Sequence, residues 1–413
     1  MFPLYTYLDE HAQELFQAEL LFAFFVIAVG CGIALHGASN SRKLQAALLG
    51  ETKMPPSDSL LGLGNLPLNA MDLSDKYVTG GAGLLGSQIV DLLLKRGETA
   101  VAVLDLVAAE QDSRVRVFTG DITDRQAFET AVRECGATCI IHTVAVFPGT
   151  PRELHFKVNV GGTENVIGVA TACGVSKLVL TSSASVVFDG SDQAGIDESA
   201  PYPEKPFDDY NETKAMAERS VLAANGRYGL STCSLRVAGL FGPRDRLAIP
   251  SMMSLIAQNR TGMQIGDNKN LFDWTYIENA AHAHLLAADR LDPNHPKYDQ
   301  VAGEAFFISN GEPRPYWDFP RALWRVAGHT PKKITVIPKP VAMVIACIME
   351  LVAWFTGKPA LLTRFRVSYV CLTRWCRIDK ARNALDYAPP VSLDEGIRRS
   401  AEWWLQTQSV KSG

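Results

Sequence analysis

The chain has 413 residues, of which 47% are hydrophobic, and a formal net charge of −4 at pH 7. This length is enough for one large domain or two ordinary domains with proper cores. The charge and the lack of a long basic run argue against a nucleic-acid partner. The eight cysteines form no Cys-x-x-Cys pair, and no histidine pair has zinc spacing. The sequence therefore predicts neither a metal site nor a disulfide framework.

An apolar run, "LLFAFFVIAVGCGIAL", occupies residues 20 to 35. Extended back to Leu15, it is nearly long enough to cross a bilayer. No Lys or Arg precedes the run, which argues against a signal peptide, whereas Arg42 and Lys43 follow it. We predict a membrane anchor in residues 1–49 that leaves the rest of the chain in the cytosol, with a buried or surface-lying helix as the alternative. Residues 50–75, rich in Pro, Ser and Gly, are expected to be a linker.

A glycine-rich turn follows in "KYVTGGAGLLGSQIVDLLLKRGE", which starts at residue 76. Gly80, Gly83 and Gly86 lie between a short apolar strand and an amphipathic helix, the context that a dinucleotide-binding turn requires. Such glycines allow the backbone N–H groups to approach a diphosphate at the start of the helix. We therefore expect these three residues to bind a dinucleotide cofactor.

Two aspartates extend this prediction. Asp105 ends the next expected strand, nineteen residues after Gly86. A carboxylate there can accept hydrogen bonds from the adenosine ribose hydroxyls and would repel a 2′-phosphate, which favours NAD over NADP. Asp121, in the turn "TGDITD", is expected near the adenine.

Strand and helix patterns continue to alternate, as in "TCIIHTVAV" and "KLVLTSSASVVFDG". Near-continuous apolar strands are typical of a parallel sheet that is buried on both faces. We predict an α/β fold with a doubly wound parallel sheet of the Rossmann type and a smaller, mixed C-terminal lobe. The expected divisions are a cofactor domain at 76–240, a substrate-binding lobe at 241–405 and a tail at 406–413.

Tyr210 and Lys214 lie four residues apart in the expected helix "DDYNETKAMAE", so their side chains share one face. A neighbouring ammonium lowers the pKa of a phenol and can turn it into a base for a substrate hydroxyl. Ser183, in "TSSAS" at the carboxyl end of a strand, is expected to hydrogen-bond the same substrate oxygen. The three residues together predict oxidation of an alcohol, with hydride transfer to NAD.

These motifs resemble the extended short-chain dehydrogenase/reductase superfamily. Together with "LRVAGLFGPRD", "IGDNKNLFDWTYIENAAHAHLLAA" and "FFISNGEPRPYWDFPRALW", they resemble its 3β-hydroxysteroid dehydrogenase family, most closely the fungal sterol-4α-carboxylate 3-dehydrogenases (decarboxylating). The resemblance covers about residues 76 to 405. Two stretches depart from the family pattern: Val237 stands where Pro is usual, and "HTVAVFPGTPREL" differs from the usual loop.

The resemblance implies catalytic roles for Ser183, Tyr210 and Lys214, of which the last two also contact the cofactor. It implies oxidation of a 3β-hydroxyl to a ketone, followed by loss of a C4 carboxylate as CO2. Asn159, in "VNVGGT", is expected near the active site, in either a direct or a structural role. The residue that binds the carboxylate is not apparent, and Lys157 and Arg244 are the candidates considered.

The resemblance also implies sterol biosynthesis at the endoplasmic reticulum membrane. Its expected assemblies are a homodimer or a sterol C4-demethylation complex. A second apolar segment, at residues 336–359, is interpreted as an interfacial helix near the sterol entrance, with a core helix as the alternative.

Three other functions fit parts of this pattern. A nucleotide-sugar epimerase or dehydratase would share the cofactor and catalytic residues, but it has no need of two apolar segments. A dehydrogenase of a related steroid or triterpenoid in a specialised pathway would share every feature. A catalytically idle NAD-binding regulator would have no need of Ser183, Tyr210 and Lys214 together.

Overall fold

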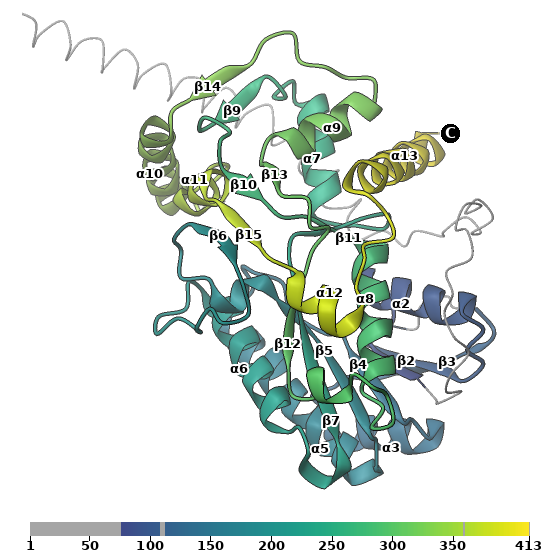
Figure 1. Ribbon diagram of the computed structural model, residues 1–413. Helices are drawn as coiled ribbons and strands as arrows, with labels where there is room; N and C mark the ends of the chain where they lie inside the picture. The colour runs from purple at the N-terminus through teal and green to yellow at the C-terminus, as the bar shows by residue number, and fades with distance from the viewer. Residues whose placement is uncertain (1–75, 108–111, 358–359, 413) are drawn as a thin grey trace, which may run out of the picture. The chain divides into compact units, whose positions relative to one another are not determined.

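The computed structural model describes residues 76–107, 112–357 and 360–412, and side chains as far as residue 408 (Figure 1). These residues belong to one compact unit, Asn69–Gly413. The predicted anchor and the predicted linker lie outside the described residues.

A seven-stranded parallel sheet forms the cofactor-binding layer, with the strand order β12-β7-β5-β4-β1-β2-β3. The strands are β1 (Lys76–Thr79), β2 (Val101–Asp105), β3 (Val115–Thr119), β4 (Cys139–His142), β5 (Lys177–Ser183), β7 (Ser231–Val237) and β12 (Ala305–Ile308). The order reverses between β1 and β4, where ligands bind in open sheets of this kind. The prediction of a doubly wound, Rossmann-type parallel sheet is confirmed.

Helices cover both faces of this sheet (Figure 1). Helices α2 (Leu84–Lys95) and α8 (Ile277–Arg290) pack on one face; α3 (Arg125–Cys135), α5 (Thr163–Cys173) and α6 (Asp209–Ala223) pack on the other. Consecutive strand residues alternate between the two cores: Tyr77 joins one, and Val78 the other. Ile140 and Ile141 are likewise both fully buried, each worth about 1.5–3 kcal/mol. This double burial explains the continuous apolar strands.

A second layer contains a four-stranded sheet in the order β13-β10-β15-β6 and two two-stranded sheets, β11-β8 and β14-β9. The strands are β6 (Gln193–Ile196), β8 (Leu240–Phe241), β9 (Met263–Ile265), β10 (Leu271–Phe272), β11 (Thr275–Tyr276), β13 (Arg314–Pro315), β14 (Thr335–Ile337) and β15 (Arg374–Cys376). The larger helices here are α7 (Ala248–Ala257), α9 (Asp318–Val326), α10 (Lys339–Thr356), α11 (Arg364–Cys371) and α13 (Leu393–Ser412).

The remaining short helices are α4 (Arg152–His155), α12 (Asp379–Leu385), a π-helical segment η1 (Phe156–Gly162), and the 3₁₀ turns η2 (Ala184–Val187), η3 (Arg227–Gly229) and η4 (Tyr298–Gln300).

The two layers exchange segments of the chain. Strand β6, from the first half of the sequence, pairs with β15 in the second layer. In the other direction, β12 and α8 lie beyond residue 240 in sequence but belong to the parallel sheet and to the helices that cover it. Residues 241–405 therefore contribute to both layers, and the surfaces where the layers meet combine residues that are distant in sequence.

Candidate active site

The glycine-rich turn connects β1 to α2 and leaves the helix N-terminus open. Gly80 has φ +79°, in the left-handed region that favours glycine. A Cβ at Gly86 would lie 2.0 Å from the Gly80 carbonyl oxygen, so only glycine lets α2 pack this closely on the turn. Gly83 precedes the helix and is exposed, and no acidic side chain lies in the first helical turn. This cradle fits a diphosphate.

Asp105 lies at the end of β2, beside the turn. One carboxylate oxygen accepts a hydrogen bond from the Ala82 N–H at 3.0 Å, and the other accepts from the Leu106 N–H at 2.7 Å. The carboxylate therefore holds the turn while its half-exposed edge stays available for ribose hydroxyls. Asp121 follows β3 and accepts from the Thr123 N–H at 2.8 Å, which fixes the loop at the same edge of the sheet. These residues fit a dinucleotide.

Ser183 is the last residue of β5 and caps the turn η2, where its hydroxyl accepts from the Ser185 N–H at 3.1 Å. Its backbone is still extended, and the turn η2 that follows carries the chain away from the sheet at the carboxyl end, where ligands bind. Helix α6 packs along β5 and β7 and brings Tyr210 to this end. Asp208 caps α6 by accepting from the Asn211 N–H at 2.8 Å, so the phenol lies in the first helical turn.

Lys214 lies one turn further along α6 and is buried. Its ammonium donates a hydrogen bond to the Thr181 carbonyl oxygen on β5, at 2.7 Å. This bond joins α6 to the strand that carries Ser183. The structure thus brings the three predicted catalytic residues to one edge of the sheet.

Burial dominates the pKa values of the site in the chain alone. Burial raises the pKa of Tyr210, and a hydrogen bond from Ser183 and the charge of Arg374 only partly oppose this. Burial also lowers the pKa of Lys214 to about 8. In the chain alone, desolvation of Tyr210 thus outweighs the neighbouring charges, and the ammonium of Lys214 is bonded to a strand carbonyl.

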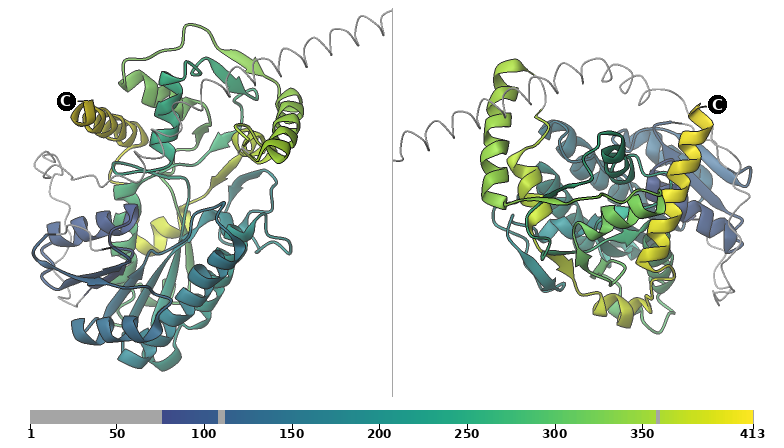
Figure 2. Two further views of the ribbon diagram at one scale, coloured as in Figure 1. Left: turned by 180° about the vertical axis from the view of Figure 1, so that it is seen from behind. Right: turned by 90° about the horizontal axis from the view of Figure 1, so that it is seen from above.

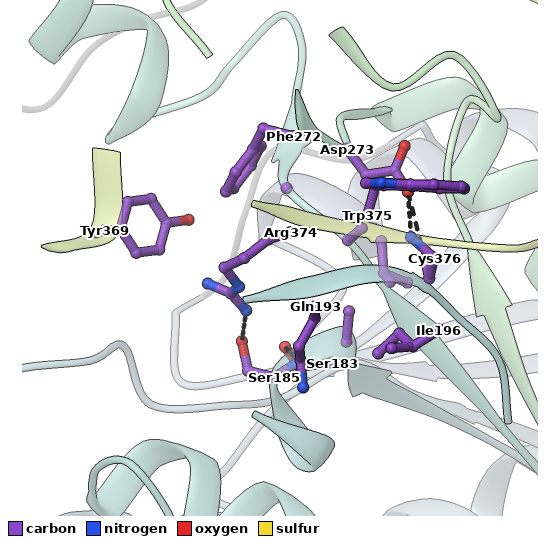
Figure 3. Close-up of a pocket in the computed structure, with 14 residues that line it drawn as sticks. Ser183, Ser185, Gln193, Ile196, Phe272, Asp273, Tyr369, Arg374, Trp375 and Cys376 are labelled. Atoms are coloured by element: carbon purple, nitrogen blue, oxygen red, sulfur yellow. Dashed lines mark hydrogen bonds between the residues drawn. The ribbon is translucent and has the colours of Figure 1, made fainter. Parts of the chain in front are cut away.

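A pocket lies beside Ser183, between the ends of β5 and β7 and the second layer (Figure 3). The empty space of the pocket, including the part open to solvent, is about 440 Å³. Its wall combines apolar and aromatic side chains with polar ones, which include Ser183, Ser185, Gln193, Asp273 and Arg374. The lining residues comprise Ser183, Ser185, Gln193, Ile196, Val237, Phe272, Asp273, Tyr369, Arg374, Trp375 and Cys376.

Arg374, on β15, is the cation of this pocket. Its guanidinium donates to the Ser185 hydroxyl oxygen at 3.1 Å, and Figure 3 shows the side chain reaching from β15 toward that serine. Its Cζ lies 4.0 Å from the Phe188 ring centre and 5.4 Å from that of Tyr369. Aromatic faces hold the cation without neutralising it. The site therefore combines a hydroxyl–phenol pair with a guanidinium that can pair with an anionic substrate group.

Arg374 was not among the residues predicted from the sequence. It lies in "CLTRWCRIDK", a stretch without a motif; its only signal was a basic residue within a short, otherwise apolar strand. The carboxylate-binding candidates that were considered lie elsewhere: Arg244 pairs with Asp91 of α2 at 3.2 Å, and Lys157 is exposed on η1. The residues that line the pocket do not include them.

Asn159 has a positioning geometry. It is buried within the π-helical segment η1; its side-chain oxygen accepts from the Val146 N–H at 2.9 Å, and its amide nitrogen donates to the Thr213 hydroxyl at 3.0 Å. Both ends of the amide are thus bonded within the protein, tying the loop after β4 to α6 next to Lys214. Of the two roles considered, this geometry favours the structural one.

The chain is similar to a known family and to curated proteins over most of its length. A family model described as the 3-beta hydroxysteroid dehydrogenase/isomerase family matches residues 77–339. The sterol-4-alpha-carboxylate 3-dehydrogenase, decarboxylating, of Schizosaccharomyces pombe is 44% identical over 78% of this chain and 95% of its own length. Its counterpart in Saccharomyces cerevisiae is 40% identical over 79% of this chain and 96% of its own length, and the human counterpart is 36% identical over 81% and 89%.

Solved structures share the fold. An epimerase from Methanothermobacter thermautotrophicus has a TM-score of 0.64 at 22% identity and covers 82% of this chain and 94% of its own. UDP-glucose 4-epimerase of Thermus thermophilus, solved with NAD, has a TM-score of 0.61 at 24% identity and covers 80% and 99%. At this level of identity the likeness shows the architecture alone.

Proposed function

Because the chain belongs to the 3-beta hydroxysteroid dehydrogenase/isomerase family, we propose that it oxidises the 3β-hydroxyl of a 4α-carboxysterol with NAD and releases the carboxylate as CO2. The names of its fungal relatives describe a decarboxylating 3-dehydrogenase of sterol-4-alpha-carboxylate. One observation carries the proposal: a guanidinium, Arg374, lies in the same pocket as Ser183 and lowers the pKa of Tyr210 against the effect of burial. An alcohol-oxidising pair and a carboxylate-binding cation are what this substrate needs.

In the oxidation step, the oxygen of Tyr210 takes the proton of the C3 hydroxyl. Ser183 hydrogen-bonds the same oxygen and orients it. The cofactor, when bound, supplies the hydride acceptor and a positive charge that favours the phenolate. Lys214 holds α6 in place through its hydrogen bond to the Thr181 carbonyl oxygen and adds a second positive charge. Burial lowers the pKa of this ammonium to about 8. The C3 carbon becomes a ketone.

In the second step, the bond between C4 and the carboxylate breaks, and its electron pair moves to the ketone oxygen. The negative charge therefore travels from the carboxylate to the C3 oxygen. Ser183 and the protonated Tyr210 donate hydrogen bonds to this oxygen, and Tyr210 returns the proton that it had taken. Arg374 binds the carboxylate before the bond breaks. Its positive charge also favours the phenolate form of Tyr210.

NAD rather than NADP is the proposed cofactor. Asp105 directs a carboxylate to the edge of the glycine-rich turn, where it would accept from ribose hydroxyls and repel a 2′-phosphate. The exposed residues that follow, Leu106 and Val107, supply no cation for such a phosphate.

The protein is further proposed to act in sterol biosynthesis at the endoplasmic reticulum membrane, with the catalytic part in the cytosol and residues 1–49 as its anchor. The N-terminal apolar run and the water-insoluble substrate support this location. A homodimer or a sterol C4-demethylation complex is the proposed assembly. Sterol relatives that lack the 4-carboxylate are the alternative substrates.

The proposal is tested by comparing substrates with the purified full chain in detergent. NADH formation is measured with a 4α-carboxy-3β-hydroxysterol and with the same sterol lacking the carboxylate. Conversion of UDP-glucose is followed by chromatography of the sugar nucleotides, because an epimerase or dehydratase returns the hydride to the sugar and forms no net NADH. We expect turnover of the first, weaker turnover of the second and none of the third. Turnover of the uncarboxylated sterol alone would replace the proposal with a plain hydroxysteroid dehydrogenase, and turnover of UDP-glucose alone would replace it with a sugar-nucleotide enzyme.

A further inference from the structure

Helix α10 presents its apolar side to the outside. Large apolar side chains recur at spacings of three and four residues, which places them on one helical face, and all are exposed: Val341, Val344, Ile348, Leu351, Val352 and Phe355. Ala342 and Ala346, on the opposite face, are buried against α11. Trp354 and Phe355 are 76% and 72% exposed at the end of the helix. We refer to this set, with Trp354 and the α11 residue Phe365, as the α10 face.

Basic residues lie at both ends of the α10 face. Exposed Lys339 begins α10, and Arg364 and Arg366 begin α11, where Arg364 pairs with Glu350 at 2.6 Å and so lies near the far end of α10. Between Lys339 and Cys371 the sequence has four basic residues and one acidic residue, in a chain whose net charge is −4. An apolar strip with cations at its margins complements an anionic lipid surface.

The helix lies on its lobe. Lys339–Thr356 is one helix of the described chain that is long and apolar enough to cross a membrane, with a mean hydropathy of 1.6. However, the strand before it, β14, pairs with β9, and α11 after it packs against α10 and leads into β15 of the pocket wall. Both ends thus return to the same lobe, and Figure 2 shows α10 at the margin of that lobe, on the side away from α13. This arrangement fits a helix that lies in the plane of a bilayer surface.

Aromatic side chains connect the α10 face to the pocket. The exposed ring of Phe365 lies 5.6 Å from that of Phe207 and stacks at 5.9 Å on that of Tyr369. Phe207 continues to Phe188 at 4.9 Å, and the Arg374 guanidinium packs on both Phe188 and Tyr369. A line of apolar rings therefore runs from a surface that suits lipid to the cation of the active site.

We propose that the α10 face docks in the headgroup region of an anionic bilayer and that the sterol passes from the bilayer to Arg374 along the rings of Phe365, Phe207 and Tyr369. The docking surface stands on the geometry of α10; the passage rests in addition on the sterol substrate of the proposed function. The bilayer supplies an apolar medium for the exposed strip and phosphates for the basic residues at its ends.

Docking is tested without turnover, through the exposed Cys347 on α10. In a Cys31→Ser background, Cys347 carries a polarity-sensitive dye, and a Cys347→Ser sample measures labelling elsewhere. With phosphatidylcholine/phosphatidylserine vesicles we expect quenching by lipids with spin-labelled chains and protection from aqueous iodide. The same dye on Val117→Cys, at the exposed edge of β3, is the matched control and should stay open to iodide.

Two outcomes would overturn docking. Iodide access at Cys347 on vesicle-bound protein would mean that another segment makes the contact. Protection from iodide without vesicles, and no lipid quenching with them, would mean that the protein's own N-terminal segment or a second copy covers the α10 face.

The passage is tested with Trp354→Glu/Phe355→Glu, against a control of two exposed residues far from α10, Tyr228→Glu/Val117→Glu. We expect the first variant to raise the KM for a sterol presented in vesicles by about tenfold, with kcat and the KM for a detergent-dissolved sterol unchanged. Equal KM values for the variant and wild type in vesicles would overturn the passage. If wild type turns over no carboxysterol in either form, the proposed function fails, while the dye result still decides docking.

Discussion

The two halves of the candidate active site are built in different ways. The half that fits the cofactor comes from contiguous sequence: the glycine-rich turn and Asp105 follow one another within thirty residues. The half that faces the substrate joins segments that are far apart, since Ser185 and Arg374 are separated by 189 positions and meet only because β15 pairs with β6.

The difference shows which kind of binding site can be recognised from a short stretch of sequence. Backbone N–H groups bind a diphosphate, and they can approach it only where glycines stand at fixed spacing. A short sequence motif is therefore enough to predict such a site. An anionic sterol substituent is held by a side chain that any neighbouring element could supply, so the tertiary structure decides which residue does it.

The strongest prediction removes the base and leaves the cofactor half intact. Tyr210→Phe should lower kcat by about a thousandfold, because the C3 hydroxyl loses its proton acceptor, while the affinity for NAD stays close to that of wild type. Tyr369→Phe, a second phenol change at the pocket, serves as the control. Steady-state kinetics and a titration of NAD binding measure both effects, and retained turnover in the Tyr210 variant would remove this residue from the mechanism.

The next prediction tests the substrate half alone. Arg374→Gln should lower kcat/KM for the 4α-carboxysterol by about a hundredfold, because a charge-assisted contact is lost. The uncarboxylated sterol should lose much less, since for it only the effect of Arg374 on the pKa of Tyr210 is removed. Arg377→Gln, three positions further along the chain, is the matched control. An equal loss for both sterols would mean that Arg374 supports the pocket without reading the carboxylate.

A third prediction breaks the cofactor half. Gly86→Ala places a Cβ 2.0 Å from the Gly80 carbonyl oxygen, so the turn must open, at about 1–3 kcal/mol, and NAD affinity should fall with it. At Gly120, a Cβ would make only an ordinary 3.5 Å contact with Leu104, so Gly120→Ala is the control. Calorimetric NAD titration and thermal unfolding report on the two effects. Unchanged NAD binding in Gly86→Ala would contradict the role given to the turn.

The smallest prediction concerns the sheet that joins the two halves. His284 is buried, and its Nε2 lies 2.8 Å from the Thr181 hydroxyl; burial lowers its pKa from 6.5 to about 4. Below pH 6.5 the unfolded chain therefore binds a proton at His284 that the folded chain does not. The free energy of unfolding decreases as the pH is lowered from about 6.5 to about 4. At pH 5 the loss should be about 2 kcal/mol from this residue.

Urea unfolding at pH 7 and pH 5 measures this loss. His284→Gln, which keeps a polar side chain without a group that titrates, should lose less stability between the two pH values than wild type. The same fall in the variant would show that other groups govern the acid side.

The sequence predicted the parts that depend on local pattern. The apolar strands specify a parallel sheet, and the positions of Ser183 and Tyr210 follow from a strand end and a helix start. The direction of the Tyr210 pKa could not be predicted, because it depends on how deeply α6 packs.

The surroundings of residues 336–359 could not be predicted from the sequence either. An apolar helix was expected there, as an interfacial or a core helix. Only the structure shows that the apolar face of α10 points outward, with 11% of the segment buried, which argues against the core alternative.

Product stoichiometry shows whether the enzyme couples oxidation of the C3 hydroxyl to loss of the carboxylate. Wild-type enzyme, NAD and a sterol with a 3β-hydroxyl and an isotopically labelled 4α-carboxylate are mixed, and NADH and labelled CO2 are followed together. We expect equal amounts of the two at every time point, with the electron pair of the broken bond held on the C3 oxygen between Ser183 and Tyr210. NADH without CO2 would contradict it, because the enzyme would then oxidise the alcohol and leave the carboxylate in place.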